Sequence, residues 1–373
     1  MPKRRANHEG TIYKRQDGRW VASVTLPGGK RKSFYGQTRQ EVAQKLTMGL
    51  KARLDGLPLP SERLTVGRYL HEWLEHAQPT MRPSTWRRYR QQLQGYAIPQ
   101  LGTRALARLE PRHVQQLYAQ CLAQGLAPGT VRQLHTILRH ALDQAAKWSL
   151  VARNVAALVV PPRVQRHEIT PLSAEQARVL LRTAQGSRLE ALYVVALSTG
   201  MRLGELLGLR WQDIDLDTAM LQVRHSLART PHGWQLLEPK TARSRRRIAL
   251  TPGAVAALRR HRSQQAAERL RLGPAWVDQD LVFPNSIGNP MDAWSVLSRS
   301  FRPLLAQAGL PRMRFHDLRH TAATLLLQQS IHPKVVSEML GHSTVGVTLD
   351  IYSHVLPDMQ QQAVTAMEHV LRS

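Results

Sequence analysis

The sequence contains almost no cysteine and no long apolar run. Its 373 residues include one cysteine, Cys121, which excludes an internal disulfide framework and fits a reducing compartment. No apolar stretch approaches the ~20 residues that a helix needs to cross a bilayer. The first ten residues, MPKRRANHEG, are charged and lack the apolar segment of a secretory signal. We therefore expect a soluble, cytoplasmic protein with no membrane partner.

Acidic residues are also scarce. The chain has 26 Asp and Glu against 52 Lys and Arg, a net charge of +26 and a pI near 11.3. So large a surplus favours nucleic acid as the partner, although basic ribosomal and membrane-surface proteins share it. Only nine of the basic residues are lysine. Arginine binds phosphate oxygens in bidentate fashion, but a GC-rich genome would produce the same bias.

Residues 10–35 predict a small antiparallel sheet. The turn signals QDGR and PGGK separate three short stretches rich in Val, Thr, Tyr and Trp. Thr38, with Glu41 three residues later, predicts the start of a helix that runs to about Leu54. We place this module at residues 1–60. Its basic residues are predicted to contact DNA, with a solvated charged edge as the alternative: Lys14, Arg15, Arg19, Lys30, Arg31 and Lys32.

Residues 64–160 predict an all-helical domain. Apolar residues recur there at spacings of three and four, and Gly125, Pro128 and Gly129 mark a turn between two helices. With few acidic partners nearby, its arginines favour a surface that tracks a DNA backbone, although solvated helix faces remain the alternative. These arginines are Arg87, Arg88, Arg90, Arg132 and Arg139. The stretch VVPPRVQRHEITPLS then predicts an exposed linker.

Residues 168–373 predict a mixed α/β domain. Ser173 and Gln176 form a capping-box pattern, and two helices are expected to meet at Thr199–Gly200. Three strands are expected in TAMLQVRHSLART, GWQLLEPKT and RRRIALTP, followed by helices to the C-terminus. The expected fold is therefore multidomain and mainly α, with small β-sheets.

Four stretches carry a family resemblance: STGMRLGELLGLRW, EPKTARSRRRIAL, RFHDLRHTAATLL and LGHSTVGVTLDIYSHV. Together and in this order, they resemble the tyrosine recombinase, or phage integrase, family. The resemblance implies an arm-type DNA-binding domain at 1–60, like that of the lambda-like integrases. It further implies a SAM-like core-binding domain at 64–160 and a tyrosine recombinase catalytic domain at 168–373.

The resemblance also implies six catalytic residues: Arg202, Lys240, His316, Arg319, His342 and Tyr352. Cutting a phosphodiester without a metal requires cations around the phosphate, where charge builds up. The two arginines would clamp it. Tyrosine, with an ordinary pKa of ~10, needs such a field to attack as a phenolate. By the resemblance, Lys240 lies on a β-hairpin, where it could donate a proton to the leaving oxygen. His316 would orient the phosphate or shuttle protons.

Neighbouring residues allow other interpretations. Arg243 is expected to bind the DNA backbone, and Arg245, Arg246 and Arg247 to bind backbone or be solvated, rather than to act in catalysis. His316 and His320 have the spacing of a zinc motif, but an aspartate replaces the motif's glutamate, so we expect no metal. We expect His320 to be a buried structural residue. Glu205 could orient a site arginine or pair with an arginine of its own helix.

The resemblance implies an enzyme that integrates and excises a phage or other mobile element. It would cut and rejoin double-stranded attachment sites through a 3′-phosphotyrosyl intermediate, as a tetramer on DNA that passes through a Holliday junction. No cofactor is expected, and the protein is expected to associate with the nucleoid. A host DNA-bending protein and an excision factor remain open as partners. The alternatives are a catalytically degenerate DNA-binding regulator and a type IB topoisomerase-like enzyme that relaxes DNA.

Overall fold

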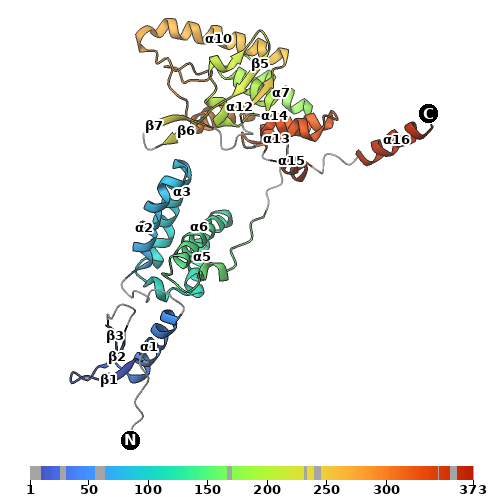
Figure 1. Cartoon of the computed structure of the whole chain (residues 1–373). Helices are drawn as coiled ribbons and strands as arrows, with labels where there is room; N and C mark the ends of the chain where they lie inside the picture. Colours follow the sequence, from blue (N-terminus) through green and yellow to red (C-terminus); the bar gives the residue numbers. More distant parts are fainter. Residues whose placement is uncertain are drawn as a thin grey trace. The chain divides into compact units, whose positions relative to one another are not determined.

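The computed structural model describes residues 10–25, 31–54, 64–165, 170–230, 233–238, 245–342, 344–352 and 359–372. The chain divides into two compact units, Met1–Arg166 and His167–Ser373, and Figure 1 labels many of their elements. Within the described ranges, no helix is long and apolar enough to cross a membrane.

The first unit begins with a three-stranded antiparallel sheet in the order β1–β2–β3. The strands are β1 (Thr11–Lys14), β2 (Trp20–Thr25) and β3 (Arg31–Gly36), and α1 (Arg39–Leu54) follows them. The backbone N–H of Glu41 donates to Thr38 Oγ1 at 3.2 Å, and Glu41 Oε2 accepts from the Gln37 backbone N–H at 3.0 Å. These reciprocal bonds satisfy donors that the first turn of a helix leaves free. The predicted sheet and helix start are confirmed.

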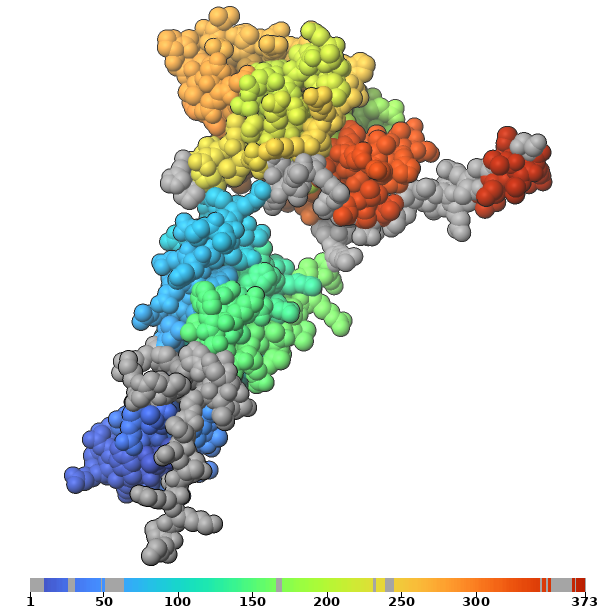
Figure 2. Space-filling model, in the orientation of Figure 1, coloured from blue at the N-terminus to red at the C-terminus, as the bar shows by residue number. Residues whose placement is uncertain are grey.

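The rest of the first unit is helical. Its α-helices are α2 (Val66–Ala77), α3 (Pro83–Gln92), α4 (Ile98–Leu101), α5 (Pro111–Ala123) and α6 (Pro128–Lys147). A π-helical turn at Leu93–Ala97 joins α3 to α4, so the helix predicted there is continuous but locally widened. Short 3-10 turns lie at Gln78–Thr80, Leu106–Arg108 and Val155–Leu158. Figure 2 shows these helices, light blue to green, as a closely packed body.

One apolar core holds the helices together. Its fully buried side chains include Leu70, Tyr118 and Leu134. Cys121 is buried in the same cluster, where the thiol acts as a small apolar group, and burial raises its pKa. The helix spacing predicted from the sequence therefore produces an amphipathic bundle.

The second unit contains ten α-helices and five strands among its described residues. The helices are α7 (Ala174–Ala184), α8 (Glu190–Thr199), α9 (Leu203–Leu207), α10 (Pro252–Leu272), α11 (Ala293–Val296), α12 (Arg302–Gln307), α13 (Asp317–Gln328), α14 (Pro333–Leu340), α15 (Val345–Tyr352) and α16 (Met359–Arg372). The strands are β4 (Ile214–Asp215), β5 (Met220–Val223), β6 (Ser226–Thr230), β7 (Gly233–Leu237) and β8 (Arg246–Ala249). The capping box at Ser173 and Gln176 is present, as predicted.

The strand prediction was wrong in one respect. TAMLQVRHSLART is not one strand: β5 and β6 are separated at Arg224–His225 and belong to different sheets, β4–β5–β8 and β6–β7. Apolar residues continue through the break, because Val223 and Leu227 both enter the same core. The pattern of buried residues therefore does not reveal where the chain changes its pairing partner.

The buried helix α8 organises the second unit. It contacts α7, α10 and α13, and its Tyr193 ring lies 6.1 Å from the Phe301 ring and 6.3 Å from the Phe315 ring. Helix α13 then packs on α14 through a small apolar cluster that includes Ala323 and Leu340. This packing brings the end of α8, the start of α13 and the end of α14 together.

Candidate active site

Arg319 is held by the turn that ends α8. Gly200 adopts a left-handed conformation with φ of 63°, and its carbonyl accepts a hydrogen bond from Arg319 Nη1 at 2.9 Å. A Cβ at Gly200 would lie 2.3 Å from Leu340 Cδ2. Glycine is therefore required both for the backbone conformation and for the close approach of α14.

Arg202 is held in a similar way at the start of α9. Its Nη1 donates to Glu205 Oε1 at 2.8 Å, and its Nη2 donates to the Gly341 carbonyl at 3.4 Å. Gly341 is also left-handed, with φ of 69°, and ends α14. The Arg202 side chain remains 39% exposed. The guanidinium is thus fixed on one side and open to a ligand on the other.

Glu205 serves both roles that the sequence left open. It pairs with Arg202 on its own helix and thereby orients a predicted site arginine. Its other oxygen, Oε2, accepts from Arg246 Nη2 at 2.9 Å. The interpretation of Arg246 as solvated or backbone-binding is wrong, because its side chain is only 6% exposed. Arg246 alternates with Ile248 on the buried face of β8, a period-two signal that the sequence already contained.

His316 and His320 lie at the beginning of α13. His316 is exposed, whereas His320 is buried as predicted, and their rings are perpendicular with centroids 5.1 Å apart. Desolvation lowers the pKa of His316, and the charges of Arg319 and Arg202 lower it further. Desolvation and the neighbouring His316 lower the pKa of His320 to about 4. Both rings are therefore neutral at pH 7, and the described residues contain no group of three His, Cys, Asp or Glu arranged to hold a metal.

His342 follows Gly341 and is half-buried. Its Nδ1 lies 2.8 Å from Thr348 Oγ1, and Thr348 is fully buried on α15. Desolvation lowers the pKa of His342 to about 4, and the charges of Arg319 and Arg202 contribute next. The predicted residues from α9, α13 and the end of α14 are therefore close enough to act on one another electrostatically.

Two predicted catalytic residues need separate treatment. Tyr352 is the last residue of α15, and its side chain lies outside the described residues, as do Lys240 and Arg243 entirely. The strands on either side of Lys240 are β7 and β8, which pair with β6 and β5 respectively. These two strands do not pair with each other, so the β-hairpin expected around Lys240 is not the arrangement of the described strands.

The N-terminal sheet has two different faces. Helix α1 covers the face that contains Ala22 and Val24. Lys14 and Lys32 belong to this face, because they pair in register with Trp20 and Val24. Lys30 lies outside the described residues. The register therefore separates Lys14 and Lys32 from the face that α1 leaves uncovered.

The uncovered face is polar and aromatic. Tyr13 and Tyr35 flank Val21 on it and are each about half exposed. The Arg31 guanidinium donates to Thr11 Oγ1 and to Ser23 Oγ, both at 3.2 Å. Arg15 and Arg19, in the turn beside this sheet, both pair with Asp17. The sequence-based prediction included the basic residues but not the two tyrosines, although alternation along the strands places both on this face.

The predicted arginines of the helical domain lie on α3 and α6. Arg88 and Arg132 line a hollow of about 320 Å³ between these helices, next to Gly129. Arg90 is exposed and stacks on the Trp86 ring at 5.4 Å. The others are Arg87, which is half-buried, and Arg139, which is exposed. Of the five predicted arginines, Arg88 and Arg132 therefore border this concave surface.

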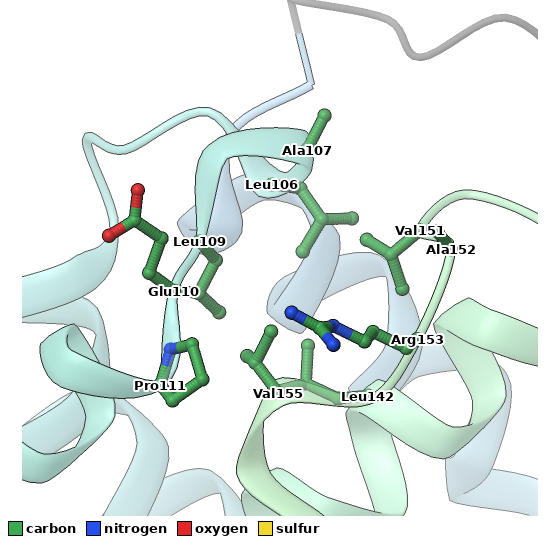
Figure 3. A pocket seen from close by; sticks show the side chains of 10 residues that line it. All are labelled: Leu106, Ala107, Leu109, Glu110, Pro111, Leu142, Val151, Ala152, Arg153 and Val155. Atoms are coloured by element: carbon green, nitrogen blue, oxygen red, sulfur yellow. The ribbon is translucent and has the colours of Figure 1, made fainter. Parts of the chain in front are cut away.

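A second pocket lies elsewhere in this domain. It has a volume of about 210 Å³ and is mostly apolar, with Leu106, Leu142 and Val155 in its lining. Figure 3 shows the Arg153 guanidinium extending among these side chains, while the Glu110 carboxylate points away. Its lining includes none of the predicted site residues, so it is not part of the site described above.

Family models match most of the chain. The phage integrase family model matches residues 170–359, and the model of the phage integrase N-terminal SAM-like domain matches residues 65–122. The chain belongs to the phage integrase family. The resemblance inferred from the four stretches is therefore confirmed.

Full-length relatives support the assignment. An integrase of Streptomyces ambofaciens is 31% identical and aligns over 100% of this chain and 99% of its own. A XerC-like tyrosine recombinase of Caldanaerobacter subterraneus is 30% identical, over 90% of this chain and 91% of its own. This phage integrase family member therefore aligns with these relatives over nearly their whole length.

Solved structures confirm the expected fold class. The Tn1549 transposon integrase, in complex with a circular-intermediate DNA, matches with a TM-score of 0.69 and 21% identity, over 81% of this chain and 99% of that one. A lambda integrase tetramer bound to a Holliday junction matches with a TM-score of 0.56 and 17% identity, over 89% and 95% of the two chains. At these identities the likeness establishes the fold of the phage integrase family member.

Proposed function

We propose that this site-specific recombinase integrates and excises a mobile element by a tyrosine-nucleophile mechanism, with Tyr352 as the attacking residue. The observation that carries the proposal is the fixed pair of guanidiniums. Arg202 and Arg319 each donate to the carbonyl of a left-handed glycine, and His342 connects the same region to the helix that ends at Tyr352. These contacts support a phosphate site near the end of α15, where we propose that Tyr352 attacks.

The chemistry conserves bond energy. The Tyr352 hydroxyl gives its proton to a neutral histidine of the site, and its oxygen forms a bond to phosphorus. The bond to the 5′ oxygen breaks, and that oxygen takes a proton, with Lys240 as the proposed donor. The product is a 3′-phosphotyrosyl link and a free 5′-hydroxyl. A 5′-hydroxyl from the partner strand then attacks the link and releases the tyrosine. The charge that builds on the non-bridging oxygens is offset by Arg202 and Arg319.

The histidines contribute without adding permanent charge. Their depressed pKa values keep His316 and His342 neutral at pH 7. A neutral imidazole can both donate and accept a hydrogen bond. We therefore assign them to orienting the phosphate and moving protons, while the arginines supply the charge.

We propose that the first unit also binds DNA, outside the second, catalytic unit (His167–Ser373). In the helical domain, Arg88 and Arg132 border a hollow whose size and charge suit a phosphate backbone. In the N-terminal module, the uncovered sheet face offers Arg31, Tyr13 and Tyr35, the side-chain types expected in a groove-reading sheet. We assign this second contact to an arm-type DNA site.

Assembly is proposed to follow that of the relatives, one of which is a tetramer on a Holliday junction. Helix α16 presents exposed apolar residues, among them Val364, Met367 and Leu371. Such a face needs a partner surface, and we propose that it packs on a neighbouring protomer on DNA. A host DNA-bending protein, an excision factor and association with the nucleoid belong to the same proposal.

The test is capture of the covalent intermediate. The purified full-length protein is incubated in chelator with DNA that carries the sequences flanking its own gene, beside Tyr352→Phe. We expect a detergent-stable adduct with the wild type only, and equal DNA binding by both. Binding without any adduct on a site that recombines in cells would favour the degenerate regulator. Relaxed plasmid without recombinants would favour a type IB topoisomerase, and an adduct in the variant would exclude Tyr352.

A further inference from the structure

Arg246 is a buried cation in contact with two parts of the candidate site. Its Nη2 donates to Glu205 Oε2 at 2.9 Å, and its Nε donates to the Met339 carbonyl at 2.6 Å. Glu205 holds Arg202, and Met339 lies in the last turn of α14, just before His342. A single side chain on β8 therefore joins the two elements that carry Arg202 and His342.

The surroundings leave this guanidinium little freedom. Its side chain is 6% exposed and that of Glu205 is 4% exposed, so neither can contact DNA directly. A Cβ at Gly341 would lie 3.0 Å from Arg246 Nη1, which means that the guanidinium packs against the turn whose carbonyl receives Arg202. Burying ions costs free energy that their pairing does not always recover. The arrangement is therefore better explained by geometry than by stability.

We propose that Arg246 is a positioning residue for DNA cleavage, which fixes Glu205 and the end of α14 so that Arg202 and His342 face the same phosphate. The proposal rests on the function proposed above for Arg202 and His342. It adds to that function a residue that touches neither the DNA nor the reacting atoms.

A planar fork is essential to this role. Nε and Nη2 bond two acceptors on different elements, and the rigid guanidinium fixes the angle between them. A lysine keeps the charge beside Glu205, but one ammonium on a flexible stem does not reproduce that geometry. The substitutions Arg246→Lys and Arg246→Met therefore separate charge from geometry.

The first measurement is single-turnover cleavage on a nicked substrate that traps the adduct, at saturating DNA. For Arg246→Met we expect a rate about 100-fold lower, because an ångström-scale misplacement of catalytic groups costs about that much, with unchanged DNA affinity. Arg246→Lys should fall between Met and wild type. The matched control is Arg259→Met, which removes an arginine that pairs with Asp217 at the surface, where its side chain is 56% exposed; it should cleave at the wild-type rate.

A second substrate distinguishes positioning from general damage. A methylphosphonate at the scissile position removes the negative charge that Arg202 neutralises. If Arg246 acts through Arg202, its substitutions should slow this substrate by a smaller factor than the phosphodiester. Equal slowing on both substrates, or wild-type cleavage by Arg246→Lys, would overturn the proposal. Thermal unfolding of each variant shows whether it still folds. If Arg246→Met does not fold, the two substrates are compared with Arg246→Lys and wild type alone. A wild type that forms no adduct would instead refute the proposed function.

Discussion

Acid should destabilise the catalytic unit through His342. The pKa of this residue is about 4 in the folded chain and 6.5 in its ordinary state. Because the folded value is lower, the unfolded chain binds more protons below pH 6.5. Stability is therefore complete above that pH and is lost as the pH falls toward 4. From the two values, lowering the pH from 7 to 5 costs about 2 kcal/mol through this residue.

The perturbation that isolates this contribution is His342→Gln. Glutamine does not titrate and keeps an amide that can bond Thr348. The variant should lose about 2 kcal/mol less than wild type between pH 7 and pH 5. His320, whose pKa is also about 4, remains in both proteins, so the difference reports His342. Exposed His369 on α16 provides the control, as His369→Gln should lose as much as wild type.

The assay must follow the catalytic unit alone. Urea unfolding at pH 7, 6 and 5, read by hydrogen exchange in peptides from the buried helix α8, reports the free energy of unfolding of that unit. If His342→Gln loses as much stability in acid as wild type, then His342 does not have a depressed pKa. The conclusion that burial and the neighbouring arginines hold this imidazole neutral would then be wrong.

Three further outcomes are expected. Thr348→Val, which removes the hydroxyl bonded to His342, should lower the cleavage rate about 10-fold or more with little loss of stability, and Thr348→Ser should restore it; wild-type cleavage by the valine variant would refute a role for the bond. Gly200→Ala, at φ of 63°, should cost at least about 1–2 kcal/mol of stability in thermal unfolding; unchanged stability would contradict the close contact with α14. Arg88→Gln and Arg132→Gln should each reduce the salt slope of DNA binding by about 1 without altering cleavage at saturation; an unchanged slope would remove them from the DNA interface.

Local signals in the sequence predicted the elements well. The QDGR turn of the N-terminal sheet and the caps at Thr38 and Ser173 are decided by a few neighbouring residues, so they can be predicted without knowing the fold. The break between β5 and β6 at Arg224–His225 could not be predicted in this way, because it depends on which strand each segment pairs with. Pairing is decided by contacts between distant parts of the chain.

The same distinction holds for the site. Arg202, Arg319 and His342 were found through motifs, and the folded chain brings their elements together. Arg246 was misjudged because three consecutive arginines look alike in sequence. Alternation along β8 distinguishes the buried Arg246 from its exposed neighbours, Arg245 and Arg247. Nothing in the sequence indicates that the Met339 carbonyl accepts a hydrogen bond from Arg246, since every residue has a backbone carbonyl.

The site combines two kinds of basic residue, the charged arginines and the neutral histidines. The arginines hold their charge at every accessible pH, and that charge helps to keep His342 unprotonated. In the proposed mechanism, the positive charge offered to the phosphate is therefore constant, while protons move through groups that are neutral at pH 7. Protonation of His342 in acid would add a cation near the phosphate but remove the lone pair that accepts a proton. Cleavage by a site built this way should thus decline in acid even though its positive charge increases, which a purely electrostatic clamp would not do.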